Sequence, residues 1–135
     1  MAYWLFKSEP DAWSWEAQQK AGKAGTDWTG VRNYTARNNM RAMKKGDEGF
    51  FYHSGAGKEI VGIVEVVKEV HPDPTDNAWQ CVTLAARRPM PKPVTLTAIK
   101  AEKELAAMAL VRLSRLSVQP VTAEEWQLVC KMSGL

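Results

Sequence analysis

The 135-residue chain is long enough for one hydrophobic core and too short to expect two domains. An apolar share of 45% and a charged share of 24% are ordinary for a globular protein, which excludes disordered and fibrous classes. The net charge of +3 argues against high-affinity binding to a long polyanion, although it permits a local basic surface.

Neither a membrane segment nor an export signal is expected. The longest apolar stretch, residues 60–67, is far shorter than the ~20 residues of a spanning helix, and no apolar run marks the N-terminus. Cys81 and Cys130 have no partner at metal-ligand spacing, so we expect no metal and no cofactor. These features predict a cytoplasmic monomer with both thiols buried and reduced.

The first half of the chain alternates strands with short helices. Residues 2–7 are apolar on both alternating faces, which indicates an interior strand. Ser14 can cap a short helix that runs toward Gly22. Residues 33–43 have helical spacing, with one apolar stripe for packing and a cationic stripe beside it.

In the second half, residues 48–54 and 59–70 should pair as an antiparallel hairpin across a short glycine-rich turn. A strand over residues 79–87 is expected to end at the prolines that follow it, Pro89, Pro91 and Pro93. Helical pieces over 94–99 and 101–108 and an extended segment over 114–120 should come next.

The last helix opens at a capping-box pattern from Thr122 to Glu125, and its spacing turns Cys130 toward the core. Strands of uneven length joined by short helices and irregular loops favour a small α+β barrel over a doubly wound sheet.

The stretch from Trp28 to Tyr34 concentrates groups that can bind a planar ligand. Trp28 offers a flat apolar plate, while Asn33 both donates and accepts hydrogen bonds, as a nucleobase pocket requires. The alternative is that Trp28 belongs to the core and Asn33 caps the following helix, since Asn is a preferred cap. The local sequence leaves both interpretations open.

Trp79 also stands at an element boundary beside an irregular loop, so its ring and that of Trp28 could close on one planar ligand. Basic residues on and before the helix over 33–43 either hold phosphates around an inserted base or form a solvated helix face. They are Arg32, Arg37, Arg41 and Lys44.

No catalytic motif is recognisable, and we expect no enzyme activity. His53 and His71 are the side chains able to act as general bases near neutral pH, and both are expected to be structural. Strand alternation separates His53 from Tyr52 and Ser54, so a shared pocket requires a bulge. The alternatives are a protein-interaction module and a small hydrolase of a nucleoside or RNA, which would bring together Lys7, Glu9, Tyr52 and His53.

Several motifs follow one another along nearly the whole chain: Trp4 to Pro10, Trp28 to Asn33, Ala36 to Met40, Gly46-Asp47, Tyr52 to Ser54, Gly62 to Val66, and Ser114 to Pro120. In these motifs the chain resembles the EVE domain, within the PUA-like group. The resemblance implies one domain over residues 1–135, a PUA-like mixed β-barrel of about five to six strands flanked by short helices. EVE domains are similar to YTH domains, which read methylated adenine in RNA, and are regarded as readers of modified bases, with modified cytosine in DNA favoured.

By this resemblance Trp28 forms one wall of a base pocket, and Trp79 lies about where a YTH domain keeps its second cage aromatic. Polar contacts to the base or a nearby phosphate would come from Lys7, Ser8, Thr29, Asn33, Tyr52 and Ser54. Arg32 and Arg115 would bind phosphate, or orient the pocket by pairing with Glu9 or a carbonyl. The expected partner is DNA or RNA that carries a modified base.

Overall fold

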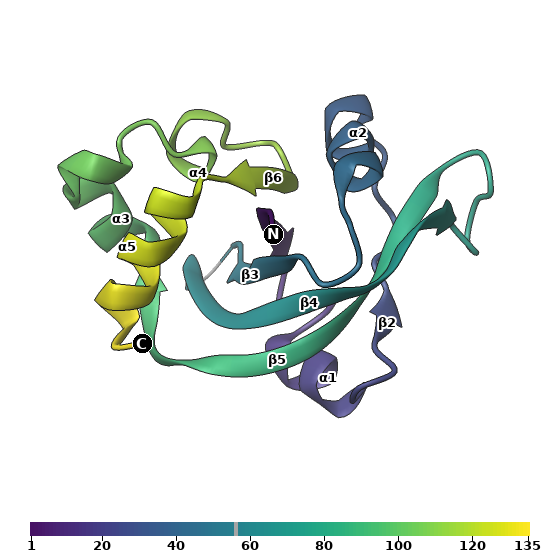
Figure 1. Cartoon of the computed structure of the whole chain (residues 1–135), viewed down its shortest axis with the longest axis horizontal. Coiled ribbons are helices and arrows are strands. Elements are labelled where there is room, and N and C mark those ends of the chain that lie inside the picture. The colour runs from purple at the N-terminus through teal and green to yellow at the C-terminus, as the bar shows by residue number, and fades with distance from the viewer. Residues whose placement is uncertain (56) are drawn as a thin grey trace.

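A computed structural model describes residues 1–55 and 57–135 (Figure 1). The elements in chain order are β1 (Tyr3–Ser8), α1 (Trp15–Lys20), β2 (Thr26–Asp27), α2 (Tyr34–Ala42), β3 (Glu48–His53), β4 (Glu59–Pro72), β5 (Gln80–Thr95), α3 (Leu96–Ala101), the 3-10 helix η1 (Lys103–Leu105), α4 (Ala109–Arg112), β6 (Val118–Val121) and α5 (Ala123–Ser133). None of the helices in the described part of the chain is long and apolar enough to cross a membrane.

The six strands form one mixed sheet in the order β2-β5-β4-β3-β1-β6. β1 pairs with β3 in parallel, and the other described pairs are antiparallel. This arrangement confirms the α+β class and the hairpin of β3 and β4, although the predicted turn includes residue 56, which lies outside the described residues. The sheet order runs from edge β2 to edge β6, and no pairing within the described residues closes it into the expected barrel.

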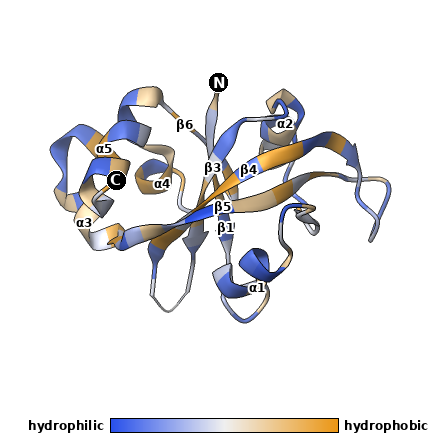
Figure 2. Ribbon diagram, turned by 60° about the horizontal axis from the view of Figure 1, so that its bottom comes forward, coloured by the Kyte–Doolittle hydropathy of each residue, from blue (hydrophilic) through white to orange (hydrophobic). Residues whose placement is uncertain are grey.

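Both faces of the sheet are covered by core side chains. In β1, Trp4 and Phe6 belong to one hydrophobic cluster, whereas Leu5 belongs to a second cluster on the other face. This period-two division is what a strand buried on both sides requires, as predicted for residues 2–7. The central strand β4 is largely orange in Figure 2, while α1 on the outside is mainly blue.

Helix α2 packs on the first cluster through Ala36 and Met40, both fully buried. Its N-cap is Asn33, whose side chain accepts a hydrogen bond from the Ala36 N–H at 2.9 Å. The helix therefore begins where an Asn cap favours it, and its start is fixed next to the stretch that carries Trp28.

Strand β5 continues through Pro89, Pro91 and Pro93, so the prediction that they end it was wrong. β2 pairs only with Thr83 and Leu84 among the described residues, which leaves the second half of β5 at the sheet edge. A proline lacks an N–H donor, and at an edge that donor has no ladder partner to lose. The three prolines are exposed, consistent with this edge position.

The C-terminal part packs on the second cluster. The helical segments begin later than predicted, but Leu105 and Met108 are fully buried, as expected. The N-cap of α5 is Thr122, which forms the predicted capping box with Glu125. Cys130 is half-buried against the second cluster and does not lie inside it.

Candidate functional site

A cavity of about 590 Å³ opens between the end of β1, the loop after it, and the segment from β2 to α2. Its volume lies within the range of pockets that hold small molecules. The lining residues are Lys7, Ser8, Glu9, Ala12, Trp13, Thr26, Asp27, Trp28, Thr29, Gly30, Val31 and Ser117. The structure thus brings together four of the predicted site residues, Lys7, Ser8, Trp28 and Thr29.

Trp28 is both a core residue and a wall of the cavity. Its exposed fraction is 7%, and the rings of Phe6 and Phe51 meet it edge-on at centroid distances of 5.5 and 5.7 Å. The Trp28 N–H donates to the Val82 carbonyl at 2.8 Å, which ties the residue to β5. The two interpretations of Trp28 therefore hold together, because packing fixes a ring that the cavity also contacts.

A second indole in the cavity wall comes from Trp13, which the sequence analysis did not single out as a site residue. Trp13 is half-buried, and its Nε1–H donates to Gln18 Oε1 at 2.9 Å. The Ser8 hydroxyl donates to the Trp13 carbonyl at 2.6 Å, so the end of β1 holds the loop that carries the indole. The break at Pro10 was the available signal that Trp13 lies outside regular structure.

Asp27 is a further cavity residue that the sequence did not single out. Its carboxylate accepts from the Thr83 hydroxyl at 2.7 Å and lies 3.2 Å from His71 Nε2. The hydrogen bond from Thr83 lowers the pKa of Asp27, burial raises it, and the contact with His71 lowers it further, so the net shift is downward. An ionised acceptor therefore stands in the cavity wall at neutral pH.

Lys7 supplies the cationic group of the cavity. Burial lowers the pKa of its ammonium, and Nζ donates to the Ser114 carbonyl at 2.7 Å. Glu9 lines the same cavity, so the two side chains are near each other without a described ion pair.

Four predicted ligand contacts lie outside this cavity. The Asn33 side-chain oxygen caps α2, and Tyr52 is buried in the second core cluster with an exposed fraction of 3%. Ser54 donates its backbone N–H to Ser8 O at 2.9 Å but does not line the cavity. Trp79 stacks on Tyr34 at a centroid distance of 5.2 Å. The fold directs each of the four toward other partners, so none of them lines the cavity beside Trp28.

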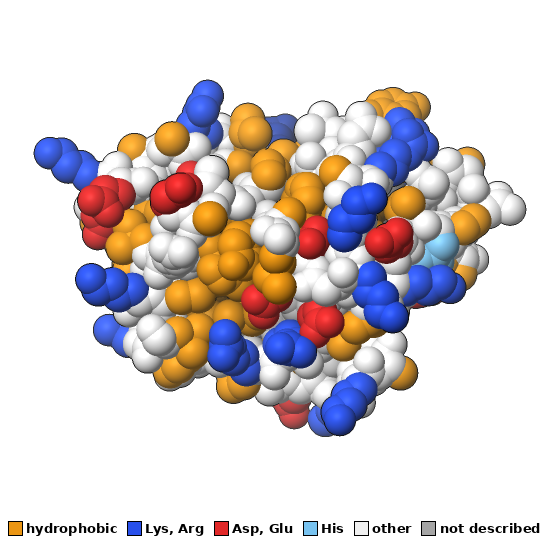
Figure 3. Space-filling model, in the orientation of Figure 1, with side chains coloured by type: hydrophobic (Ala, Val, Ile, Leu, Met, Phe, Trp, Pro, Cys, Tyr) orange, Lys and Arg blue, Asp and Glu red, His pale blue; other side chains and the backbone are white. Residues whose placement is uncertain are grey.

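Arg32 donates to the Val31 carbonyl at 2.9 Å, one of the two kinds of partner expected for it, and it also pairs with Asp73 at 3.2 Å and with the Thr75 hydroxyl. Arg41 binds the Gln80 side chain. Figure 3 shows blue Lys and Arg side chains spread over both halves of this face, including the half that carries α2 and the ends of β4 and β5. Arg115 lines a smaller hollow of about 350 Å³, together with Asn33 and Thr35 at the start of α2.

His53 does not face the cavity. A register shift between Phe51 and Tyr52 supplies the irregularity that a shared pocket would need, yet His53 Nε2 accepts from the Trp15 N–H at 3.1 Å. Its neighbour Tyr52 is buried on the second cluster. The fold thus does not bring these two residues to Lys7 and Glu9.

The His53 hydrogen bond predicts a pH dependence of stability. Burial lowers the pKa of His53 below the ordinary 6.5, outweighing Glu59, so the native state binds fewer protons than the unfolded chain. The contribution of His53 to the free energy of unfolding should therefore be at its maximum above about pH 6.5 and decrease as the pH is lowered below that value. Urea unfolding between pH 5 and 8 measures this dependence. His53→Gln keeps an acceptor without titrating, and an unchanged pH dependence in this variant would contradict the assignment.

Asp27, His71 and Cys81 place three potential metal-ligand atoms within 4.8 Å of one another. The His71 Nδ1 atom faces the Glu69 carbonyl at 2.8 Å, and Nε2 lies 3.4 Å from the Cys81 sulfur. Burial raises the pKa of the Cys81 thiol to about 11, with Asp27 adding to the effect. A metal ligand must be a thiolate, so this donor set suits a hydrogen-bonded cluster better than a metal centre.

These features define an α+β fold of the PUA-like kind with an aromatic, polar cavity. The YTH domain of Zygosaccharomyces rouxii MRB1, solved with N6-methyladenosine RNA, has this fold with a TM-score of 0.63. It is 14% identical, and the alignment covers 98% of this chain and 86% of that one. The EVE domain family matches residues 2–132, and the chain belongs to that family.

Relatives within the family include thymocyte nuclear protein 1 from rat, 37% identical over 96% of this chain and 73% of the relative. A crystal structure of a protein from Agrobacterium tumefaciens is 58% identical with a TM-score of 0.98, covering 100% of this chain and 94% of that one. The structure of human THYN1 protein in complex with 5-methylcytosine-containing DNA is 32% identical with a TM-score of 0.93, covering 100% and 99%.

Proposed function

We propose that this chain is a non-enzymatic reader that takes one modified base, with 5-methylcytosine in DNA favoured, into the cavity beside Trp28. The observation that carries the proposal is the cavity itself, in which two indoles stand beside a carboxylate and an ammonium. The similarity to human THYN1, solved with 5-methylcytosine-containing DNA, supports the choice of base and nucleic acid.

The polar groups of the cavity suit the edge of cytosine. Asp27 is an acceptor for the exocyclic amine, in the way that Asp and Glu accept from cytosine N4 in DNA complexes. Lys7 is a donor for the base carbonyl or an adjoining phosphate. Trp13, Trp28 and Val31 provide apolar surface for the ring and its methyl group.

Selectivity for the methyl group is modest in this proposal. Burying one methyl contributes about 0.8 kcal/mol, which corresponds to about a fourfold difference in affinity. Extruding a base from a duplex costs a few kcal/mol, so a base that is already unpaired binds more tightly. Phosphates beside the base are held by the basic residues around α2, Arg32, Arg37, Arg41 and Lys44, and Arg115 contacts the strand farther away.

The competing hypothesis of a small hydrolase rests on Lys7 and Glu9, which do share the cavity. It also requires Tyr52 and His53, and these side chains are engaged elsewhere. We therefore favour binding without catalysis. The corresponding assay is incubation with oligonucleotides and nucleosides followed by chromatography, where product formation that depends on Lys7 would favour the hydrolase.

Titration of single-stranded oligonucleotides, followed by tryptophan fluorescence, tests the reader directly. We expect a 5-methylcytosine oligonucleotide to bind about fourfold more tightly than its cytosine counterpart. Trp13→Ala should weaken binding about tenfold, because it removes a stacking wall from a half-buried position without opening the core. Gln127→Ala, on the exposed side of α5, is the matched surface control. Equal affinity for both oligonucleotides, abolished by salt, would refute modification-specific reading.

A further inference from the structure

Four side chains form an aromatic and cationic cluster at the start of α2, outside the cavity. We call it the Tyr34 stack, and it consists of Arg32, Tyr34, Arg37 and Trp79. The Tyr34 and Trp79 rings are nearly parallel, with an interplanar angle of 28°. The Arg37 guanidinium lies 4.8 Å from the Tyr34 ring centre and 5.9 Å from that of Trp79, and Arg32 lies 5.7 Å from Trp79.

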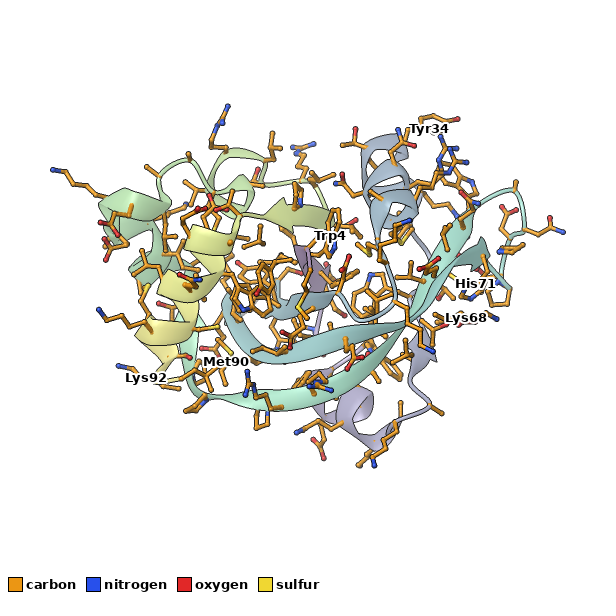
Figure 4. The ribbon with its side chains drawn as sticks, in the orientation of Figure 1. Trp4, Tyr34, Lys68, His71, Met90 and Lys92 are labelled. Carbon is orange, nitrogen blue, oxygen red and sulfur yellow. The ribbon has the colours of Figure 1, made fainter. Side chains whose placement is uncertain are left out.

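The Tyr34 ring contributes little to the core. Its exposed fraction is 65%, one of the largest for an apolar residue in the described chain, and Figure 4 shows it at the outer end of α2. The Arg37 guanidinium and the Trp79 ring centre are 5.9 Å apart, and they lie 4.8 and 5.2 Å, respectively, from the Tyr34 ring centre. They therefore do not cover the Tyr34 ring from opposite sides. Much of the ring is therefore available to a partner in solution.

Arg37 has hydrogen-bond donor capacity that the described residues do not use. Its Nε atom is buried and has no hydrogen-bond partner among the described residues. Its Nη2 atom makes one long contact of 3.4 Å with Asn38. A guanidinium with unused donor capacity, beside the exposed Tyr34 ring and the half-buried Trp79 ring, suits a nucleotide, whose base stacks and whose phosphate accepts.

The Tyr34 stack is fixed relative to the cavity through Asp73. The Asp73 carboxylate accepts from the Gly30 N–H at 3.0 Å and from Arg32 at 3.2 Å, and its side chain is fully buried. Gly30 lines the cavity, so one carboxylate holds both the cavity rim and the arginine of the stack. Tyr34 follows Gly30 by four positions, which limits the distance between their Cα atoms to about 14 Å.

We propose that the Tyr34 stack is a second nucleotide subsite, on which an unpaired base flanking the modified base stacks. This inference rests on the proposed function, since the cavity base sets the register of the strand. Stacked nucleotides rise 3.4 Å each, so the flanking base lies within about four positions of the modified one. The protein consequently prefers single-stranded or locally opened DNA to a closed duplex, in which neighbouring bases remain stacked on each other.

The experiment compares Tyr34→Ala, Tyr34→Phe and the wild type on two ligands, 5-methyl-2′-deoxycytidine monophosphate and a single-stranded nonanucleotide with central 5-methylcytosine. We expect Tyr34→Ala to weaken nonanucleotide binding about tenfold and to leave monophosphate binding unchanged. Tyr34→Phe keeps the ring and should bind both ligands within twofold of the wild type. Thermal unfolding verifies that all three proteins are equally folded.

Abasic spacers identify the stacked base. Each nucleotide from one to four positions on either side of the modified base is replaced by a spacer that keeps the phosphate. At one position the spacer should weaken wild-type binding about tenfold but cause no further loss in Tyr34→Ala. The inference is overturned if Tyr34→Ala binds the nonanucleotide like the wild type. It is also overturned if Tyr34→Ala lowers the affinity for every spacer-containing nonanucleotide by the same factor as for the intact one. Binding of both ligands that ignores the methyl group would instead refute the proposed function.

Discussion

Trp28→Ala is expected to lower the free energy of unfolding by about 3–5 kcal/mol and to abolish modification-dependent binding. The large stability effect follows from the position of the indole against Phe6 and Phe51, where its removal leaves a cavity in the first core cluster. The binding effect follows from the cavity that the same ring lines. Urea denaturation measures the first effect, and fluorescence anisotropy of a labelled 5-methylcytosine oligonucleotide measures the second.

Trp126→Ala is the matched control for this prediction. Trp126 is as buried as Trp28, with an exposed fraction of 6%, but it stacks on Phe50 and Tyr3 in the second cluster. Its loss should destabilise the fold by a similar amount and spare binding, provided that the assay temperature keeps both variants folded. If the two variants lost binding equally while folded, the assignment of Trp28 to the ligand site would be wrong.

Asp73→Ala is expected to lower the free energy of unfolding by about 2–4 kcal/mol and to weaken oligonucleotide binding. The fully buried carboxylate accepts hydrogen bonds from the Thr75 N–H at 2.7 Å and hydroxyl at 2.6 Å, besides those from Gly30 and Arg32. Alanine leaves these donors without a buried acceptor and releases the loop at the cavity rim. Asp76→Ala, which removes an exposed acceptor of the same loop, should cost less than about 1 kcal/mol.

The charge of Asp73 also predicts an acid dependence. Burial would raise its pKa, but the hydrogen bonds from Thr75, Gly30 and Arg32 hold the pKa well below the ordinary 3.8. A lowered native pKa stabilises the fold at all pH values above about 3.8, and the contribution falls as the pH drops below that value. The stability difference between wild type and Asp73→Asn should therefore be constant from pH 5 to 8 and shrink below pH 4. A difference that instead grows on acidification would contradict an ionised Asp73.

Together these variants separate the two parts of the proposed nucleic-acid surface. Trp28 belongs to the cavity, Tyr34 belongs to the proposed flanking subsite, and Asp73 affects both because it connects Gly30 with Arg32. The cavity variant should remove the preference for the methyl group. The flanking variant should lower affinity for longer strands without changing that preference.

The local sequence was sufficient for features whose partners are near in the chain. The capping box from Thr122 to Glu125 and the Asn33 cap were recognisable because each joins residues three positions apart. The interior position of β1 was recognisable because its apolar residues occupy both faces of a period-two pattern. The motif order along the chain likewise indicated the EVE family, which the family match over residues 2–132 confirms.

The sequence by itself thus determined the α+β class, the main strands, the caps, and the expectation that Trp28 lines a pocket. Only the tertiary structure decided which side chains share the cavity, because strand register brings Lys7, Trp13 and Asp27 together from separate elements. It also placed Trp79 against Tyr34, 45 positions earlier in the chain, and outside the cavity that Trp28 lines. Contacts of this kind depend on how β4 and β5 curve and pair, and no periodicity within one segment encodes that pairing.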